Sequence, residues 1–251
     1  GAGTYGVYIN TGTLTMSGSW IHECTEGIYS NNANVTVDHT IFSGNTTDGI
    51  NFRRPSSGTS TLDIDYCTFY GNGDAIEVYR NSSSSYLVYF YINSSIFYNN
   101  TYIVRDVSSS SYKCYFQSFV DNVWAGNQFA STNTPSTNTG NLNYNPLLAD
   151  PAGGDFEPTN RSPARYFDPS NPSLTAGAVE YAGAPTGTGV HGFWYENYEF
   201  AIDSVTEVAG DMVIAPDYTV TFLPGARFQM ATTDIMEGGL NNTKIEIRVE
   251  G

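Results

Sequence analysis

The chain has 251 residues, of which 40% are hydrophobic, 14% aromatic and only 14% charged, and its formal net charge at pH 7 is −15. This charge disfavours nucleic acid and anionic membrane surfaces as partners, because both would repel the protein. No apolar run approaches the roughly 20 residues of a membrane-inserted helix. The 19 Tyr, 14 Phe and 25 Gly residues suit strands and tight turns, so we expect an all-β fold.

A five-residue segment that begins at Gly6 recurs at Gly27, Gly49, Ala75 and, more weakly, Tyr102. The spacings between these starts are 21, 22, 26 and 27 residues. A repeat of this length predicts a solenoid in which each copy opens one coil.

Two more alternating segments follow the first one in each coil. Leu14-Thr15-Met16 and Val35-Thr36-Val37 represent the second segment, and Ile41-Phe42 and Thr68-Phe69 represent the third. Side chains of a strand alternate between its two faces, so the apolar members of a segment face one side. We therefore predict a right-handed parallel β-helix with three short strands per coil and a C-terminal β-rich extension. A β-sandwich is the alternative fold.

Equivalent side chains on successive coils should form rows along the axis, about 4.8 Å apart. The predicted apolar row inside the coils consists of Ile21, Phe42, Phe69, Phe97 and Trp124. The predicted row at one turn consists of Asn45, Asn72, Asn100 and Asn127. Asparagine tolerates left-handed backbone, and its amide can hydrogen-bond along a stack. Differences in coil length fall in the Ser-rich stretches 55–60, 82–85 and 108–111, which we expect to form loops at one corner.

Tyr8 and Tyr29 occupy equivalent outward positions, and Asn51 and Glu77 continue their row. Aromatic and polar side chains in a row can hold sugar rings, although tyrosines on a sheet also serve cross-strand packing. These four residues are the candidate carbohydrate-binding site.

Asp38 and Asp65 occupy equivalent positions on neighbouring coils. Two carboxylates about 5 Å apart repel each other, which favours a bound cation such as Ca²⁺. These two residues are the candidate metal site. Ca²⁺ has no further support in the sequence, and we expect no other cofactor.

The segment Asn45-Thr46-Thr47-Asp48-Gly49 is similar to the Asn-Thr-Asp motif of polygalacturonases, which are parallel β-helix enzymes, with one residue inserted. The Asp-Asp, Gly-His-Gly and Arg-Ile-Lys motifs of that family are absent, so we interpret the segment as a turn that leads into Gly49 and assign no catalytic residue. Cys24, Cys67 and Cys114 include no Cys-x-x-Cys pair and are expected to be small buried residues.

After Trp124 the repeat stops, and the polar residues 131–141 are predicted to form a linker or surface loop. Four short elements follow, namely Asn145-Pro146-Leu147-Leu148-Ala149-Asp150-Pro151, Gly154-Asp155-Phe156, Ser162-Pro163-Ala164 and Gly177-Ala178-Val179-Glu180-Tyr181. Residues 141–181 thereby resemble the closing segment of secreted parallel β-helix proteins of the choice-of-anchor Q kind, and the repeats before them resemble pectin-lyase-like solenoids. Arg165-Tyr166 departs from the Ile-Asp that often follows Ser-Pro-Ala. The resemblance implies a secreted or surface-anchored protein and no particular reaction.

Residues 190–251 begin strands again, in a pattern similar to the opening coils of secreted solenoids. The first coil at Gly6 has no cap before it, and uncapped strands favour pairing with another chain. Two interpretations stay open. The chain is a fragment of a longer modular protein, or the end of one subunit covers the first coil of the next and gives a head-to-tail fibre. The residues predicted to take part in assembly are Gly6, Val7, Ile9, Val213, Ile214, Val220, Phe222, Phe228, Ile245, Ile247 and Val249.

The predicted segments are 1–128 for the coils, 129–181 for a loop-rich closing segment, 182–189 for a hinge and 190–251 for the extension. We expect a non-catalytic extracellular or cell-surface solenoid with a structural or adhesive role. Its expected partners are copies of itself or neighbouring modules, and polysaccharide is a further candidate. The alternatives are a polysaccharide lyase or hydrolase and a carbohydrate-binding module.

Overall fold

The computed structural model describes residues 4–56, 58–81, 86–109, 111–127, 134–166, 175–183, 189–241 and 243–249. The chain divides into two compact units: unit 1 comprises Gly1–Leu142 and Ala176–Val179, and unit 2 comprises Asn143–Thr175 and Glu180–Gly251. The Ser-rich stretch 82–85 and most of the predicted hinge lie outside the described residues. Within the described part of the chain, no helix is long and apolar enough to span a bilayer.

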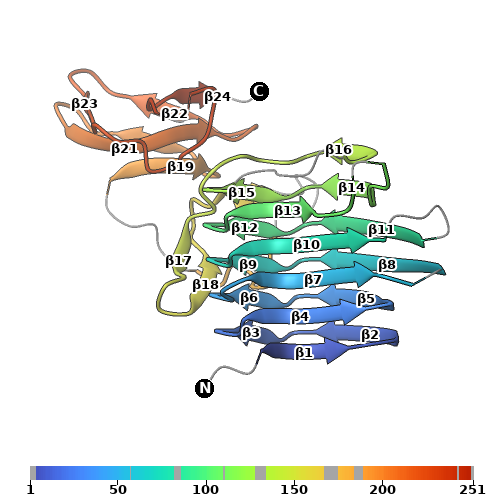
Figure 1. Cartoon of the computed structure of the whole chain (residues 1–251). Helices are drawn as coiled ribbons and strands as arrows, with labels where there is room; N and C mark the ends of the chain where they lie inside the picture. Colours follow the sequence, from blue (N-terminus) through green and yellow to red (C-terminus); the bar gives the residue numbers. More distant parts are fainter. Residues whose placement is uncertain are drawn as a thin grey trace. The chain divides into compact units, whose positions relative to one another are not determined.

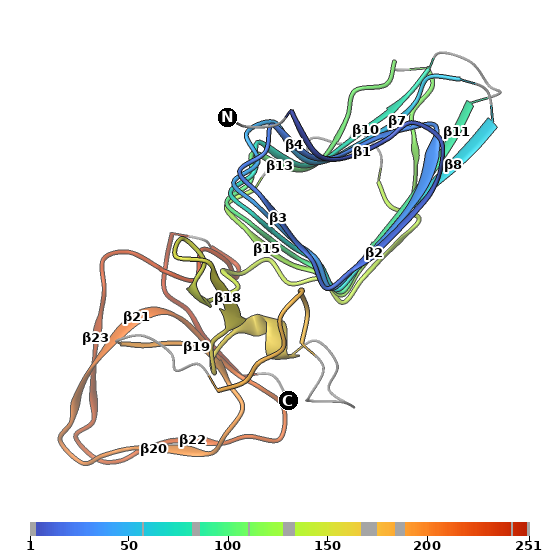
Figure 2. The same ribbon diagram turned by 90° about the horizontal axis from the view of Figure 1, so that it is seen from below.

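Unit 1 is a column of coils whose strands form three parallel sheets (Figure 1). The first sheet contains β1 (Tyr5–Ile9), β4 (Glu26–Asn31), β7 (Asp48–Arg54), β10 (Asp74–Arg80) and β13 (Tyr102–Asp106). The second contains β2 (Gly12–Ser17), β5 (Ala33–Asp38), β8 (Gly58–Asp65), β11 (Tyr86–Asn93), β14 (Tyr115–Val120) and β16 (Thr137–Thr139). The third contains β3 (Trp20–His22), β6 (Ile41–Ser43), β9 (Thr68–Tyr70), β12 (Ile96–Tyr98) and β15 (Val123–Ala125). Along the column axis, the coils superpose (Figure 2), which confirms the predicted right-handed parallel β-helix.

The predicted apolar row lies inside the column in the predicted register. Phe42 pairs with Ile21 and Phe69, and Phe97 pairs with Phe69 and Trp124. The ring centroids of Phe42 and Phe69 are 4.8 Å apart and those of Phe69 and Phe97 are 5.0 Å apart, with nearly parallel planes in both pairs. These three phenylalanines are fully buried, and each is covered by the phenylalanines of the neighbouring coils. The apolar interior of a coil is therefore buried by stacking on its neighbours.

The predicted asparagine row also forms. Asn45 Nδ2 donates to Asn72 Oδ1 (2.9 Å), Asn72 Nδ2 to Asn100 Oδ1 (2.8 Å), and Asn100 Nδ2 to Asn127 Oδ1 (3.0 Å). Each accepting oxygen also takes the backbone N–H of the asparagine one coil earlier, as Asn72 Oδ1 does from Asn45 (3.1 Å). The row therefore satisfies buried backbone groups of the turn as well as its own amides.

The fifth copy of the first segment is shifted by one residue from the predicted register. Glu77 pairs with Arg105, so Ile103 rather than Tyr102 takes the place of Ala75. The prediction was wrong because the four earlier coils have Gly or Ala at this inward position, and a large isoleucine there concealed the match.

Two stretches predicted as loops contain strand residues. Within the predicted linker, β16 pairs with β14 as the sixth strand of the second sheet. In the stretch 55–60, Gly58–Ser60 belong to β8, which pairs with β11 over eight residues. Thr and Ser are as common in polar loops as on exposed strands, which concealed both strands from prediction. Asn141 could have indicated the additional coil. Its Oδ1 accepts the Asn122 N–H (2.8 Å), so these two asparagines form a second row at another turn of the coils.

Unit 2 contains a hairpin and a second set of parallel strands. The hairpin consists of β17 (Leu148–Asp150) and β18 (Asp155–Pro158), and the 3-10 helix η1 (Pro163–Tyr166) follows. The later strands are β19 (Val190–Trp194), β20 (Tyr198–Phe200), β21 (Val205–Ile214), β22 (Val220–Phe222), β23 (Arg227–Met230) and β24 (Ile247–Val249). They pair in parallel as β19-β21-β23, with β24 also on β21, and as β20-β22. Trp194, Phe200, Met212 and Ile214 form the apolar core of these strands.

A short piece of the predicted closing segment belongs to unit 1. Gly177 donates its N–H to the Ser94 carbonyl (2.8 Å), and Ala178 donates to Thr68 Oγ1 (3.0 Å). A Cβ on Gly177 would lie 2.6 Å from Ile96 Cδ1, and its φ is +93°, so glycine is required there. The limits predicted for the four segments stay a prediction.

The cysteines are free thiols, and two of them are buried as predicted. Cys67 and Cys114 are buried, whereas Cys24 is half-buried. Burial raises the pKa of the Cys67 and Cys114 thiols. Both therefore stay protonated and unreactive at neutral pH.

Candidate functional site

The first sheet carries two outward rows of side chains along the column. One row contains Tyr5, Glu26, Asp48, Asp74 and Tyr102, and the other contains Tyr8, Tyr29, Asn51, Glu77 and Arg105. Between the rows, two consecutive residues of each middle strand face inward: Ile50 lies in the core, and a Cβ on Gly49 would lie 3.0 Å from Phe69 Cδ1. The first sheet is bent inward (Figure 2). The two outward rows come into contact, since Asn51 of one row donates a hydrogen bond to Asp48 of the other.

Three carboxyl groups converge on this face in the middle coils. Carboxylate oxygens of Asp48, Asp74 and Glu77 lie within 4.8 Å of one another. The three residues are 0%, 5% and 7% exposed, respectively. Acidic side chains are almost never buried to this extent without partners. We call these three residues the acidic cluster.

Two arginines and one asparagine contact the acidic cluster. Arg105 Nε lies 2.6 Å from Asp74 Oδ2, and its Nη2 donates to Glu77 Oε2 at 2.5 Å. Arg53 Nη1 is 3.7 Å from Glu77 Oε1. Asn51 Nδ2 donates to Asp48 Oδ2 (3.1 Å) and to Glu77 Oε1 (3.3 Å). Asp48 therefore has an amide partner, whereas Asp74 and Glu77 share a guanidinium.

Burial and mutual repulsion disfavour the charged form of these carboxyl groups. The pKa of Asp48 rises to about 7, chiefly because burial removes water and also because Glu77, Asp74 and Glu26 repel its charge. Burial also raises the pKa of Asp74 and of Glu26. A carboxyl group that titrates near neutral pH responds to pH changes in the physiological range.

Three buried oxygens at and beside the cluster have no hydrogen-bond donor among the described residues. They are Asp48 Oδ1 and Asn51 Oδ1, on residues that are 0% and 4% exposed, and Glu26 Oε2 on the neighbouring strand. Buried polar atoms without a partner are rare in folded proteins and call for an explanation such as an ion or water.

The predicted carbohydrate-binding row is aligned as expected, but its members differ in exposure. The Tyr8 and Tyr29 rings are stacked 5.6 Å apart, and Tyr8 is 55% exposed. Asn51 and Glu77, which continue the row, are buried within the acidic cluster and its contacts. The tyrosines are thus the accessible part of the row.

The predicted metal pair is aligned in register but has other partners. Asp38 pairs with Asp65 on neighbouring strands of the second sheet. Asp38 Oδ1 contacts His39 Nδ1 at 2.6 Å, and Asp65 Oδ1 accepts a hydrogen bond from Asn93 Nδ2 (3.1 Å). Among the described residues, the group of three carboxylates lies on the first sheet instead.

The predicted assembly residues lie in the first coil and in unit 2. Val213 and Ile214 are buried in unit 2, at 0% and 5% exposure. Ile247 and Val249 on β24 are exposed, at 42% and 72%. Phe222 stacks on a neighbouring phenylalanine and is 45% exposed. The accessible members are therefore those at the strand edges of unit 2 and in the first coil.

Comparison with known protein families matches residues 1–141 to the family described as a right handed beta helix region. The match covers more than half of the 251 residues. The chain belongs to this family. Neither the comparison with curated proteins nor the comparison with solved structures gave a significant match to this β-helix protein. The family accounts for the fold of the coils and assigns no role to the acidic cluster.

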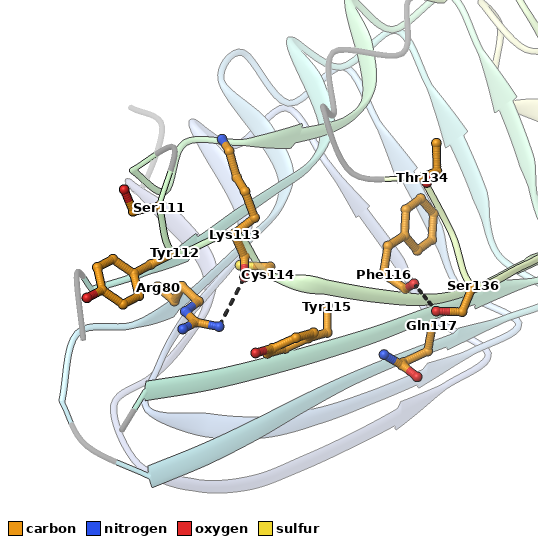
Figure 3. Close-up of a pocket in the computed structure, with 10 residues that line it drawn as sticks. All are labelled: Arg80, Ser111, Tyr112, Lys113, Cys114, Tyr115, Phe116, Gln117, Thr134 and Ser136. Carbon is orange, nitrogen blue, oxygen red and sulfur yellow. Dashed lines mark hydrogen bonds between the residues drawn. The ribbon is translucent and has the colours of Figure 1, made fainter. Parts of the chain in front are cut away.

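A polar pocket of 460 Å³ lies between the end of β10 and the start of β14 in the β-helix. In Figure 3 the Arg80 guanidinium lies between the rings of Tyr112 and Tyr115, 5.7 and 5.3 Å from their centroids. Arg80 Nη1 donates to the Lys113 carbonyl (3.0 Å). Because these contacts fasten the loop before β14 to the column, we interpret Arg80 as a structural residue.

Sequence reasoning missed Asp48, Asp74 and Arg105 as site residues. Asp48 was interpreted as part of a turn, and the shifted register of the fifth coil hid the position of Arg105. The sequence did contain a signal for these positions. In the third and fourth coils, polar residues flank two consecutive inward residues, as Asp48 and Asn51 do in the third. In a regular strand, residues i and i+3 point to opposite faces. Here both point outward, because the two residues between them face inward.

Proposed function

We propose that this β-helix protein is a non-catalytic, extracellular structural or adhesive protein that assembles head to tail through its first coil. The observation that carries the proposal is the exposure of that coil. Its interior residues Val7, Leu14 and Met16 are only partly buried, and Tyr8 and Trp20 are 55% and 49% exposed. Among the described residues, β1, β2 and β3 each pair with one other strand. Strand edges next to exposed apolar side chains favour pairing with a further strand.

The proposed partner of this end is unit 2 of the next copy. Its strands pair in parallel, as those of the coils do. Phe222, Ile247 and Val249 place exposed apolar side chains on its outer strands. An interface that repeats from copy to copy without closing gives a fibre. The extracellular location rests on the resemblance of residues 141–181 to the closing segment of secreted solenoids.

The burial of the acidic cluster favours a non-catalytic role. A general acid has to approach the reacting atom to about 2.6–3.2 Å. Asp48 is the carboxyl group whose pKa of about 7 would suit that role, yet it is 0% exposed. A polysaccharide chain lying on the sheet would therefore not reach it, which counts against a lyase or hydrolase.

We expect the purified chain to form oligomers whose mass rises with concentration, measured by size-exclusion chromatography with light scattering, and fibres in electron micrographs. The double variant Tyr8→Lys/Trp20→Lys should raise the concentration needed for assembly by about tenfold or more, because charge on an edge strand opposes pairing. Val107→Lys is the control, since Val107 is 40% exposed and lies in the fifth coil. A monomer at every concentration, or equal weakening by the control, would contradict the proposal.

A second candidate function, carbohydrate binding, is favoured by the aromatic group at the same end of the first sheet. The Tyr5 ring lies 5.5 Å from that of Tyr8 and 5.0 Å from that of Tyr29. Their exposed ring surfaces and hydroxyl groups suit a sugar, which offers apolar C–H faces and polar hydroxyls. The net charge of −15 favours a neutral polysaccharide over a polyuronate.

Affinity electrophoresis in gels that contain a neutral polysaccharide, such as xyloglucan or galactomannan, tests this candidate. We expect retardation that falls about tenfold in Tyr8→Ala/Tyr29→Ala and stays unchanged in Tyr70→Ala/Tyr98→Ala, a pair 6.0 Å apart on the third sheet. Polygalacturonate should give no retardation. Equal migration of wild type in all gels would exclude carbohydrate binding of this type, and release of reducing sugar ends would favour the enzyme alternative instead.

A further inference from the structure

The surroundings of the acidic cluster hold more negative than positive charge. Glu26 adds a fourth carboxyl group, because it is the register partner of Asp48 on the neighbouring strand β4. Arg53 and Arg105 are the cations in contact with this group among the described residues. Four carboxyl groups thus stand beside two guanidinium groups, and when all four carboxyl groups are ionised, two negative charges are uncompensated. One divalent cation would balance them.

Arg105 contacts one oxygen each of Asp74 and Glu77, whereas Asp48 Oδ1 and Asn51 Oδ1 have no hydrogen-bond partner among the described residues. Arg105 occupies Asp74 Oδ2 and Glu77 Oε2. Asp48 Oδ1 has no donor and is fully buried, and Asn51, whose amide bridges Asp48 and Glu77, also has an unpartnered oxygen. These atoms are neutral or anionic oxygens, which are the ligands of hard cations.

We infer that Asp48, Asp74 and Glu77 bind a divalent cation of the Ca²⁺ class on the outer face of the first sheet, with Asn51 as an additional oxygen ligand. Ca²⁺ binds oxygens at about 2.3–2.6 Å, so ligands on opposite sides of the ion lie about 4.6–5.2 Å apart. The carboxylate oxygens of the three residues lie within 4.8 Å of one another, which is close enough for one such ion to contact all three. Mg²⁺ requires about 2.0–2.1 Å and near-ideal octahedral geometry, which fits a rigid sheet face less well.

This site differs from the Asp38–Asp65 pair, which provides a matched control. Asp38 and Asp65 are also adjacent acidic residues on neighbouring parallel strands. Their oxygens contact His39 and Asn93, and the Asp38 side chain is 43% exposed. Variants of the acidic cluster and of the Asp38–Asp65 pair therefore distinguish cation binding at a buried oxygen site from attraction by any two neighbouring negative charges.

The test is calorimetric titration of the full chain, freed of metal by chelator, with CaCl₂ and with MgCl₂ at pH 8 and without any polysaccharide. We expect one Ca²⁺ per chain, binding at least about tenfold tighter than Mg²⁺, and a rise in the melting temperature on adding Ca²⁺. Asp48→Asn and Glu77→Gln should each weaken Ca²⁺ binding by about tenfold or more, whereas Asp38→Asn/Asp65→Asn should leave it within about twofold.

Absence of binding heat and of a melting-temperature shift at millimolar Ca²⁺ would overturn the inference. The inference would also be overturned if Asp48→Asn and Glu77→Gln bound Ca²⁺ as tightly as wild type. The same holds if only the Asp38→Asn/Asp65→Asn variant lost Ca²⁺ binding. Circular dichroism establishes that each variant is folded, and if Asp48→Asn is not, Glu77→Gln decides. Since no polysaccharide is present and the protein is kept dilute, the result is independent of assembly and of carbohydrate binding.

Discussion

Replacing Asn72 by Ala should lower the free energy of unfolding by about 3–5 kcal/mol. Asn72 Nδ2 donates to the Phe42 carbonyl (3.0 Å) and to Asn100 Oδ1 (2.8 Å). Its Oδ1 accepts the side-chain and backbone N–H groups of Asn45 (2.9 and 3.1 Å). The alanine removes the side-chain partner of the buried Asn45 N–H and of the Phe42 carbonyl, and each buried group left unsatisfied costs about 1–3 kcal/mol. Asn100 Oδ1 keeps the backbone N–H of residue 72, and Asn45 Nδ2 keeps the Ile21 carbonyl. Urea denaturation followed by circular dichroism measures the change.

Asn34→Ala is the matched control for Asn72→Ala. Asn34 is exposed and accepts a single hydrogen bond, from the Thr61 N–H (3.0 Å). Its replacement should cost less than about 1 kcal/mol. Hydrogen exchange adds a local measurement, because the Asn45 amide should lose protection in Asn72→Ala only. Equal stability of the two variants would show that the asparagine row contributes little.

Raising the pH from 5 to 8 should destabilise the protein by about 2–3 kcal/mol through Asp48 alone. Its pKa is about 7 in the folded protein and about 3.9 in the unfolded chain. Between these values the folded state holds a proton that the unfolded state lacks, so stability falls as the pH rises through this window. The groups that face Asp48 are Glu26, Asp74, Glu77 and Arg105, and the measurement uses a chelator so that no cation offsets their charge.

Asp48→Asn isolates this contribution, because asparagine keeps the shape of the side chain and does not titrate. The difference in unfolding free energy between wild type and Asp48→Asn should change by about 2–3 kcal/mol from pH 5 to pH 8, in favour of the variant. Asn34→Ala, which replaces an exposed residue that does not titrate, should retain the wild-type pH dependence. Parallel pH profiles for wild type and Asp48→Asn would show that Asp48 is not desolvated in solution.

The rows of the β-helix were predictable because one residue type recurs at each of their positions. Phe42, Phe69 and Phe97 fixed the register of the third strand, and the asparagines fixed the turn after it. Where the residue type changes, the prediction failed. Ile103 stands where earlier coils have Gly or Ala, so the fifth copy was placed one residue too early.

The acidic cluster was less predictable, because it depends on a bend and not on strand alternation. Strict alternation would place Asp48 on the same face as Ile50, inside the column. The inward position of Gly49 next to Phe69 breaks that alternation and turns Asp48 outward beside Asn51. The burial of the carboxyl groups, which sets their charge, comes from neighbours on three coils and has no signature in any single segment.

The asparagine row also makes the column modular. From Asn45 to Asn72 the chain completes one circuit and returns to the same amide contact, and the next circuit ends at Asn100 in the same way. A gene duplication that copies one whole circuit would therefore lengthen the protein by about 4.8 Å while every new contact repeats an existing one. Evolution can adjust the length of such a protein in whole-coil steps, without redesigning its cross-section.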